Sequence, residues 1–353
     1  MKEINININK FFGANLPFVV YNKPNSNKVI GLFQHDSVLH TPSNTYQDKG
    51  FVFAPFNAID KTVLFPITEV KKVACSFKKE TMFLEKHVAV NTTSKDSHVQ
   101  LVTKAINAIQ DNQFQKVVLS RQEFVQLTDF DICAIYYKLI QRYPNAFVYV
   151  WFHPKIGLWF GATPETLVQV SKGRFTTVAL AGTQPYKENQ QVHWSPKEID
   201  EQELVTDYIT EKLSSFASNL NISTTETVKA GTLYHLQTKI EGTLETSNKN
   251  SLYHLVNLLH PTPAVCGYPK EVSKQFIVEN ELYERSYYTG FLGELNIDED
   301  NNEDSHLFVN LRCMEIIETT AVIYVGGGIT KGSNPEKEWE ETVDKSAIMR
   351  HVL

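Results

Sequence analysis

Short apolar stretches separated by turn residues dominate the first 90 residues of the chain. Each stretch has four to seven residues, and glycine, proline or asparagine lies between consecutive stretches. This arrangement is typical of β-strands joined by tight turns. We therefore expect four strands in this part of the chain, at Phe18–Tyr21, Val29–Phe33, Gly50–Phe56 and Thr62–Phe65.

A helical spacing of apolar residues first appears after residue 95. It predicts helices from Ser97 onward, over Ile132–Gln141, from Ser195 to about Phe216 and from about Pro335 onward. Further strands are expected at Lys116–Arg121, Ala146–Phe152, Gly157–Gly161, Thr166–Val170, Phe175–Ala181, Leu307–Ile317 and Ala321–Val325. Because the strands follow one another in runs joined by short turns, we predict the α+β class with a largely antiparallel sheet. A doubly wound nucleotide-binding fold would instead alternate strands with helices.

The charge balance excludes some classes of function. The chain has 353 residues, with 34 basic and 40 acidic side chains and a formal net charge of −6. This argues against a protein that binds nucleic acid or an anionic membrane surface. No apolar run approaches the roughly 18 residues of a membrane-spanning helix, and Met1–Lys10 has no apolar signal core. The cysteines form no Cys-x-x-Cys pair, so we expect reduced thiols in a cytoplasmic protein. They are Cys75, Cys133, Cys266 and Cys313.

Two of the expected helices begin with the pattern Ser-x-x-Glu and a proline inside it, at residues 195–198 and 333–336. This pattern is typical of a capping box, which explains Glu198 without a functional role. Glu201 extends the apolar stripe of the first helix, where a carboxylate needs a positive partner. Glu338 and Glu341 in the second helix have two interpretations. Either the helix dipole favours these acids, or one of them shares a hard cation such as Mg²⁺ with Glu201.

A lysine and a glutamate on or beside strands are candidates for acid–base chemistry. Lys116 begins an alternating strand and would ordinarily reach solvent, whereas a role as general base would require it to be buried. Glu165 follows a proline in the turn Gly161–Glu165 and would ordinarily be exposed. In a closed cavity it could instead be held protonated as a general acid. The pattern alone leaves both alternatives open.

Three further features concern a small anionic ligand. Arg312 lies in an expected strand with two apolar faces, so it needs a protein acid or a ligand carboxylate as its partner. The segment Gly326–Ile329 follows a strand as a glycine loop whose backbone N–H groups could bind an anion. His260, in the stiff segment His260–Ala264, is either a structural hydrogen-bonding residue or a ligand-binding one. The pattern thus indicates an α+β enzyme that acts on a small carboxylate, with Mg²⁺ as a candidate cofactor.

Seven motifs in one order resemble those of the chorismate-utilising enzymes, the superfamily of anthranilate synthase component I, and among them the isochorismate synthases. They are Lys116-Val-Val-Leu-Ser-Arg121, Gly161-Ala-Thr-Pro-Glu165, Leu180-Ala-Gly-Thr183, Glu201-x-Glu-Leu-Val205, His260-Pro-Thr-Pro-Ala264, Arg312-Cys313, and Gly326-Gly-Gly-Ile329 followed by Glu338-Trp-x-Glu341. The resemblance implies a chorismate-binding catalytic region over residues 96–353. Residues 1–95 carry no motif and would complete the sheet scaffold. We therefore expect one structural domain of two large, mainly antiparallel β-sheets packed as a sandwich with peripheral helices.

The resemblance also implies roles for individual residues. Lys116 matches the general base that activates water for attack at C2 of chorismate, and Glu165 matches the general acid that protonates the departing C4 hydroxyl. Glu201 and Glu338 match ligands of Mg²⁺, and Glu198 and Glu341 match residues that hold its waters. The remaining matches are substrate-binding positions and their apolar wall, namely Gly182, Thr183, His260, Ala264, Val265, Arg312, Gly327, Gly328 and Lys345.

The same resemblance separates the possible reactions. Lys116 occupies the place of a glutamine in anthranilate synthase and aminodeoxychorismate synthase, and Ala181 that of a catalytic lysine in the latter. Water is therefore the expected nucleophile, and no glutaminase subunit is expected. We predict a monomeric isomerase, an isochorismate synthase that serves menaquinone or siderophore biosynthesis. Two alternatives stay open: a salicylate synthase, which goes on to eliminate pyruvate, and a catalytically silent chorismate-binding homologue. Two departures from the family, Gln184 and Val265, concern contacts with the substrate rather than the acid or the base.

Overall fold

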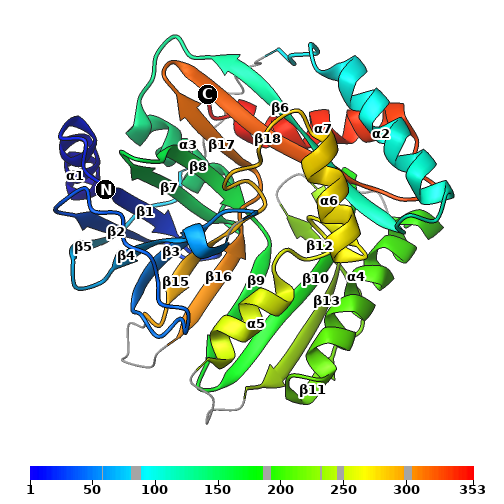
Figure 1. The fold of residues 1–353 in the computed structure, drawn as a ribbon. Helices are drawn as coiled ribbons and strands as arrows, with labels where there is room; N and C mark the ends of the chain where they lie inside the picture. The colour runs from blue at the N-terminus through cyan, green and yellow to red at the C-terminus, as the bar shows by residue number, and fades with distance from the viewer. Residues whose placement is uncertain (58, 81–88, 186–191, 231–232, 245–249, 298–303) are drawn as a thin grey trace.

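Two antiparallel sheets form the scaffold of the molecule (Figure 1). The structure is a computed structural model that describes residues 1–353 apart from 58, 81–88, 186–191, 231–232, 245–249 and 298–303. The first sheet has the order β14 (Gly267–Tyr268), β6 (Lys116–Gln126), β18 (Thr320–Ile329), β17 (Cys313–Ile317), β8 (Gly157–Thr163), β7 (Phe147–His153), β1 (Phe18–Asn22), β2 (Lys28–Gln34) and β5 (Val70–Ser76).

The second sheet has the order β11 (Ser218–Ile222), β13 (Leu233–Thr243), β10 (Arg174–Pro185), β9 (Thr166–Ser171), β16 (Ser305–Val309), β15 (Phe291–Leu295), β3 (Gly50–Ala54) and β4 (Val63–Pro66), and β12 (Glu226–Ala230) also pairs with β13. A short 3₁₀ turn, η1 (Ile59–Lys61), lies between β3 and β4. The helices are α1 (Lys2–Gly13), α2 (Lys95–Gln110), α3 (Ile132–Arg142), α4 (Pro196–Ser214), α5 (Ser251–Leu259), α6 (Lys270–Asn280) and α7 (Pro335–Arg350). The predicted α+β class with two antiparallel sheets and peripheral helices is confirmed.

An aromatic core joins the two sheets. Tyr21 and Trp151 of the first sheet lie in one buried cluster with Phe51 and Phe53 of the second. Phe53 packs against Trp151 with 4.8 Å between their ring centroids. Pairs of buried aromatic rings in tilted contact add to the stabilisation that comes from removing their surface from water. This core fixes the two sheets against each other and thereby fixes the space where their loops meet.

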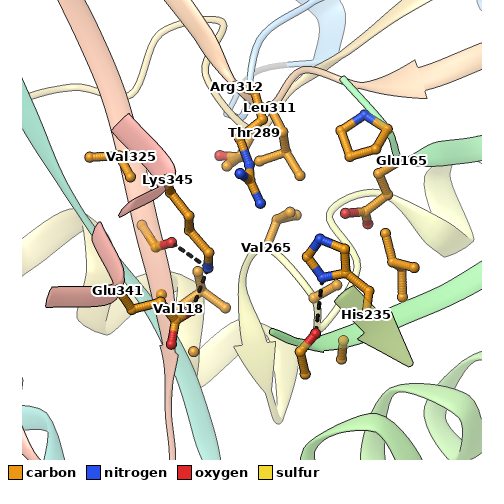
Figure 2. Close-up of a pocket in the computed structure, with 18 of the residues that line it drawn as sticks. Val118, Glu165, His235, Val265, Thr289, Leu311, Arg312, Val325, Glu341 and Lys345 are labelled. Atoms are coloured by element: carbon orange, nitrogen blue, oxygen red, sulfur yellow. Dashed lines mark hydrogen bonds and ion pairs between the residues drawn. The ribbon is translucent and has the colours of Figure 1, made fainter. Parts of the chain in front are cut away.

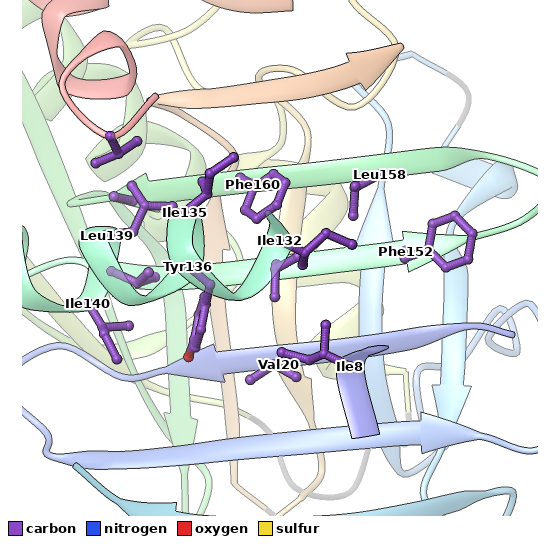
Figure 3. Packing of buried hydrophobic residues seen from close by; sticks show 14 of the residues in the cluster. Ile8, Val20, Ile132, Ile135, Tyr136, Leu139, Ile140, Phe152, Leu158 and Phe160 are labelled. Carbon is purple, nitrogen blue, oxygen red and sulfur yellow. The ribbon is translucent and has the colours of Figure 1, made fainter. Parts of the chain in front are cut away.

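Helices cover the outer faces of both sheets. α1 and α3 pack on the first sheet, and their buried apolar side chains recur every three to four residues, as the helical period requires (Figure 3). The Asp131 side chain caps α3 by accepting a hydrogen bond from the backbone N–H of Ala134 at 3.0 Å. α4 and α5 cover the second sheet, and α2 and α6 pack beside β6. In the part of the chain that the structure describes, no helix is long and apolar enough to cross a membrane.

Three local expectations differ from the structure. The predicted strand Leu307–Ile317 is two strands in different sheets, β16 and β17, because the chain turns over residues 310–312. Buried Asn310 holds this turn by accepting a hydrogen bond from the Tyr149 hydroxyl at 2.6 Å. The glycines expected in a loop belong to β18, where Gly327 pairs with Leu119 of β6.

The second predicted capping box is also replaced by a different cap. Asn334, rather than Ser333, caps α7, because its side-chain oxygen accepts hydrogen bonds from the backbone N–H groups of Glu336 and Lys337. The first capping box is confirmed, since Glu198 Oε2 accepts a hydrogen bond from the Ser195 backbone N–H at 2.7 Å.

Candidate active site

A central cavity lies where loops and strand ends of both sheets meet α4 and α7 (Figure 2). The space that atoms do not fill there, including space open to solvent, amounts to about 700 Å³. The lining residues are Val118, Pro164, Glu165, Leu180, Ala181, Gly182, Glu201, His235, Ala264, Val265, Tyr288, Thr289, Leu311, Arg312, Tyr324, Val325, Gly326, Gly327, Gly328, Glu341 and Lys345. Segments far apart in the sequence therefore contribute to one site.

Glu165 is a buried carboxyl group on the wall of this cavity. It lies between β8 and β9, and its backbone carbonyl accepts a hydrogen bond from the Val309 backbone N–H at 3.0 Å. Burial raises the pKa of Glu165 to about 7, although the cations of Lys116, Arg312 and Lys345 act in the opposite direction. Because the acid and its conjugate base are both populated near neutral pH, the group can donate a proton there. The expectation of a glutamate held in a closed cavity agrees with this burial.

Lys116 is fully buried at the start of β6. Its ammonium nitrogen forms an ion pair with Glu201 Oε1 of α4 at 2.9 Å. Lys116 is not among the described lining residues of the cavity, whereas Glu201 is. Gly328 packs closely against both side chains: a Cβ atom there would lie 2.3 Å from Glu201 Oε1 and 3.1 Å from Lys116 Cε. The expected positive partner of Glu201 is therefore Lys116.

Carboxylates of α7 face this wall and are paired with lysines. Glu338 Oε1 lies 2.5 Å from Nζ of Lys197, and Glu341 Oε1 lies 2.5 Å from Nζ of Lys345. Burial, together with the neighbouring Glu341, raises the pKa of Glu338. Burial alone would also raise the pKa of Glu341, but the adjacent Lys345 ammonium lowers it. Buried Glu338 and half-buried Glu341 thus share a highly charged corner.

The carboxylates suit a hard cation in their donor chemistry. Glu338 Oε2 is buried and has no hydrogen-bond partner among the described residues. A Cβ atom at Gly327 would lie 3.5 Å from this oxygen and 3.7 Å from Glu341 Oε1, so the missing side chain leaves a cradle between them. Oxygen ligands of this kind suit Mg²⁺. In the described ranges, no three His, Cys, Asp or Glu side chains are grouped so that they could hold a metal ion. Lys197 and Lys345 are the counter-ions that the structure gives these acids.

Glu198 has different contacts from the other predicted metal residues. Its carboxylate accepts hydrogen bonds from Ser195 at the start of α4 and from the Gln184 side chain at 3.1 Å. It is not among the described lining residues of the cavity. Its place at the helix start agrees with the capping interpretation.

Arg312 presents a cation to the cavity from the turn between β16 and β17. Its backbone has φ of +48°, in the left-handed region, and its guanidinium points into the cavity in Figure 2. Atom Nη1 is buried and has no hydrogen-bond partner in the described part of the protein. Leaving such a donor unpaired costs about 1–3 kcal/mol. A ligand carboxylate would remove this cost.

His235 of β13 is a cavity residue that the sequence analysis did not identify. Its Nδ1 atom lies 2.9 Å from the Gly182 carbonyl oxygen, so Nδ1 carries the proton and donates it. Burial lowers the pKa of His235 to about 3, and the imidazole is therefore neutral, with Nε2 as an acceptor. In Figure 2 the ring lies across from Glu165. A single histidine in a strand has no spacing pattern that would single it out.

Other predicted substrate-binding residues divide into three groups. Gly182, Ala264 and the apolar Val265 line the cavity, as do Gly327, Gly328 and Lys345. His260 does not: it is buried beside Phe291 with Nε2 3.3 Å from the Phe56 carbonyl oxygen, which agrees with its structural interpretation and not with a place in the cavity. Thr183 is in β10, but its side chain lies outside the described residues.

The arrangement can move protons at two places. A carboxyl group with a pKa of about 7 lies on one wall, and a lysine–glutamate pair lies against Gly328 of β18 on another. The Arg312 guanidinium, whose Nη1 atom has no hydrogen-bond partner among the described residues, points into the cavity. A site of this kind suits acid–base chemistry on a small anion.

Comparison with known proteins identifies the family of this chain. The model of the chorismate binding enzymes matches residues 57–353. The isochorismate synthase EntC of Escherichia coli (strain K12) is 32% identical over 269 residues, which cover 72% of this chain and 66% of EntC. The isochorismate synthase DhbC of Bacillus subtilis (strain 168) is 32% identical over 55% of this chain and 50% of DhbC. The chain thus spans about half to two thirds of the length of these curated relatives.

Solved structures show the same fold. One is DhbC from Bacillus anthracis, described as a putative 2,3-dihydroxybenzoate-specific isochorismate synthase. It superposes with a TM-score of 0.78 at 22% identity, over 96% of each chain. MenF, the menaquinone-specific isochorismate synthase from Escherichia coli, superposes with a TM-score of 0.79 at 20% identity, over 96% of this chain and 88% of MenF. With a family model that matches residues 57–353 and a fold shared over nearly the whole length, the chain belongs to the chorismate-binding enzyme family.

Proposed function

We propose that this protein is a Mg²⁺-dependent isochorismate synthase that converts chorismate reversibly to isochorismate. The observation that carries the proposal is Glu165, a carboxyl group whose pKa burial raises to about 7. The same cavity presents Arg312, whose Nη1 atom has no partner among the described residues. Relatives from two genera, EntC of Escherichia coli and DhbC of Bacillus subtilis, are both named isochorismate synthases, which supports the assignment.

Glu165 acts as the general acid in this proposal. A hydroxyl group is a poor leaving group unless it is protonated as its bond to carbon breaks. The protonated form of Glu165 supplies that proton to the C4 hydroxyl, which departs as water. At neutral pH about half of the Glu165 side chains carry the proton, because the pKa is about 7.

Lys116 acts as the general base. It removes a proton from the water that attacks C2. One C–O bond forms at C2 while another breaks at C4, and both ring double bonds shift, from C1=C2 to C1=C6 and from C5=C6 to C4=C5. One water enters and one leaves, and the reaction is an isomerisation. Lys116 acts as a base only as the neutral amine, so its ammonium group must first lose a proton, and Glu201 Oε1, 2.9 Å from Nζ, is positioned to accept it.

The substrate has two carboxylates. A cationic side chain would bind one of them, and a metal ion held by acidic side chains would bind the other. Arg312 would bind the enolpyruvyl carboxylate in bidentate geometry, satisfying its buried Nη1 atom. Glu201 and Glu338 would hold Mg²⁺ and Glu341 would hold its waters, and the ion would neutralise the ring carboxylate when bound. Lys197 and Lys345 balance the charge of these acids while no ion is present.

Separation of the reaction products by HPLC tests the proposal. Purified protein is incubated with chorismate and Mg²⁺, with and without EDTA and with and without ammonium. We expect isochorismate to approach a fixed ratio with chorismate, EDTA to abolish turnover, and ammonium to have no effect.

Other products would overturn parts of the proposal. Salicylate with pyruvate would replace it with a salicylate synthase, and anthranilate would show that ammonia is the nucleophile. Chorismate that stays unchanged would identify a silent homologue. Full turnover in EDTA would remove the metal role of Glu338.

A further inference from the structure

A buried ion pair outside the central cavity, Glu281 with Arg285, has no part in the proposed chemistry. The two side chains are almost completely buried, with 1% and 2% of their surfaces exposed. Glu281 Oε1 lies 2.6 Å from Arg285 Nη2, and Glu281 Oε2 accepts a hydrogen bond from Arg285 Nε at 2.8 Å. Neither residue is among the described residues that line the cavity. Because burial of such a pair has a desolvation cost and is weak evidence for stability, its other contacts need an explanation.

The Arg285 guanidinium has an acceptor for each of its five N–H donors. Two of these donors bind Glu281. The other three reach separate segments of the chain. Nη2 donates to the Val118 carbonyl at 2.7 Å, and Nη1 donates to the Val265 carbonyl at 2.9 Å and to Thr289 Oγ1 at 3.3 Å. Because the guanidinium is planar and rigid, it fixes these acceptors relative to one another.

The three segments that Arg285 contacts are walls of the central cavity. The residues concerned all line it, namely Val118, Val265 and Thr289 (Figure 2). The first of them lies on β6, two residues after Lys116. Thr289 donates its backbone N–H to the Asn310 carbonyl at 2.9 Å, in the turn that presents Arg312. The ion pair thus connects the strand of the lysine with the turn of the arginine.

Glu281 and Arg285 also take the place of a neighbouring strand along β6. β14 pairs with β6 only at the first two residues of that strand, and it is the last strand of the described sheet on this side. Beyond it, the Val118 carbonyl accepts a hydrogen bond from Arg285, and the Ser120 backbone N–H donates one to Glu281 Oε1 at 2.7 Å. Buried backbone groups need such partners. The pair therefore holds the edge of the strand on which Lys116 lies.

We propose that Arg285 and Glu281 are positioning residues for the reaction, which hold the strand of Lys116 in place against the turn that presents Arg312. This inference rests on the proposed function, in which Lys116 is the base and Arg312 binds a carboxylate of the substrate. Neither positioning residue lines the cavity, so both act through the walls that they hold. A displacement of about 1 Å at reacting groups can cost about 10²-fold in rate.

Arg285→Lys tests this role because it keeps the positive charge and removes the fork. One ammonium nitrogen cannot replace three nitrogen atoms that donate in fixed directions. We expect kcat to fall about 10- to 100-fold and KM to stay within about threefold, since every side chain that lines the cavity is kept. Conversion of chorismate with Mg²⁺ is followed by HPLC, at a temperature where far-UV circular dichroism shows each variant to be folded.

Glu281→Gln is the second variant, and Glu294→Gln is its matched control. Glu294 is also a buried acid, which accepts a hydrogen bond from the Tyr21 hydroxyl at 2.6 Å and forms an ion pair with Lys23. It is not among the described lining residues of the cavity. Both glutamine variants should be less stable in denaturant unfolding. Only Glu281→Gln should lower kcat, by at least about fivefold, and it keeps the test valid if Arg285→Lys does not fold.

Several outcomes would overturn the positioning role. Folded Arg285→Lys and Glu281→Gln proteins that are less stable but have the kcat of the parent would show a purely structural pair. An equal loss of kcat in Glu294→Gln would show a general loosening of the fold, and failure of both test variants to fold would assign the pair to the scaffold alone.

The parent protein keeps this inference separate from the proposed function. If the parent forms a product other than isochorismate, the proposed function fails, while the ratio of kcat between variant and parent still decides the positioning role. A parent protein that converts no chorismate would refute both.

Discussion

The carboxyl group of Glu165 has a protonation state that both stability and activity should report. Its pKa is raised from 4.5 to about 7 because burial disfavours the charged form. A rise of that size corresponds to about 3 kcal/mol between the two protonation states. Between pH 4.5 and 7 the folded protein keeps a proton that the unfolded chain has already lost, so the free energy of unfolding falls as the pH rises through this window.

Glu165→Gln removes this dependence while it keeps the size and shape of the side chain. At pH 8 we expect the variant to have a free energy of unfolding up to about 3 kcal/mol above that of the parent, because it no longer buries a charge. At pH 4 the two proteins should differ little. Denaturant unfolding at both pH values measures the difference, with Glu203→Gln, an exposed acid on α4, as the matched control.

The same substitution should remove activity. We expect kcat to fall by about 10²- to 10⁴-fold, which is the usual contribution of a general acid. In the parent protein kcat/KM should fall as the pH rises above about 7, since the acid form is lost there. An inactive variant whose gain in stability is the same at pH 4 and pH 8 would contradict the pKa argument, and a fully active one would contradict the acid role.

Three further variants test the other parts of the site. Gly328→Ala places a methyl group 2.3 Å from Glu201 Oε1, so we expect kcat to fall about 10- to 100-fold while the fold is kept. Gly332→Ala is the control, because no atom lies within 4 Å of its Cβ, and its kcat should be normal. Equal kcat values for the two variants would refute this account of Gly328. Lys116→Met should lower kcat by about 10²- to 10⁴-fold and leave chorismate binding by calorimetry measurable, and normal rates would exclude the lysine as base. Glu338→Gln should weaken Mg²⁺ binding by calorimetry at least about tenfold, and an unchanged affinity would remove Glu338 from the metal site.

Strands with strong apolar character were predictable from the sequence, but α1 was not. Its residues Ile4, Ile6 and Ile8 alternate with asparagine, which is a strand-like period, yet the segment is a helix with Ile4 and Ile8 buried and Ile6 exposed at 56%. Packing of one helical face against the first sheet decides the conformation here, and local pattern does not contain that information. The break at Asn310 was hidden for a similar reason, since both flanking strands are apolar and only a buried tertiary contact marks the turn.

The candidate site was predictable where order along the chain carries information. Lys116 and Glu165 could be selected because several motifs occur in one sequence, although each alone favoured an exposed side chain. The pairing of Glu338 with Lys197 could not be anticipated, because it joins the first turns of two helices that are far apart in the chain. His235 was missed because burial and a contact with Gly182, rather than spacing, give it a place in the cavity.

The first 76 residues supply strands to both sheets, and this has a consequence for any shortened form of the protein. β1 pairs with β7, and β3 pairs with β15. A chain that starts at residue 96 would leave β7 and β15 as open sheet edges, with unpaired N–H and C=O groups on strands in which every residue is now buried. Such edges recruit strands from other molecules. The motif-bearing part expressed alone should therefore aggregate rather than fold as a small catalytic module.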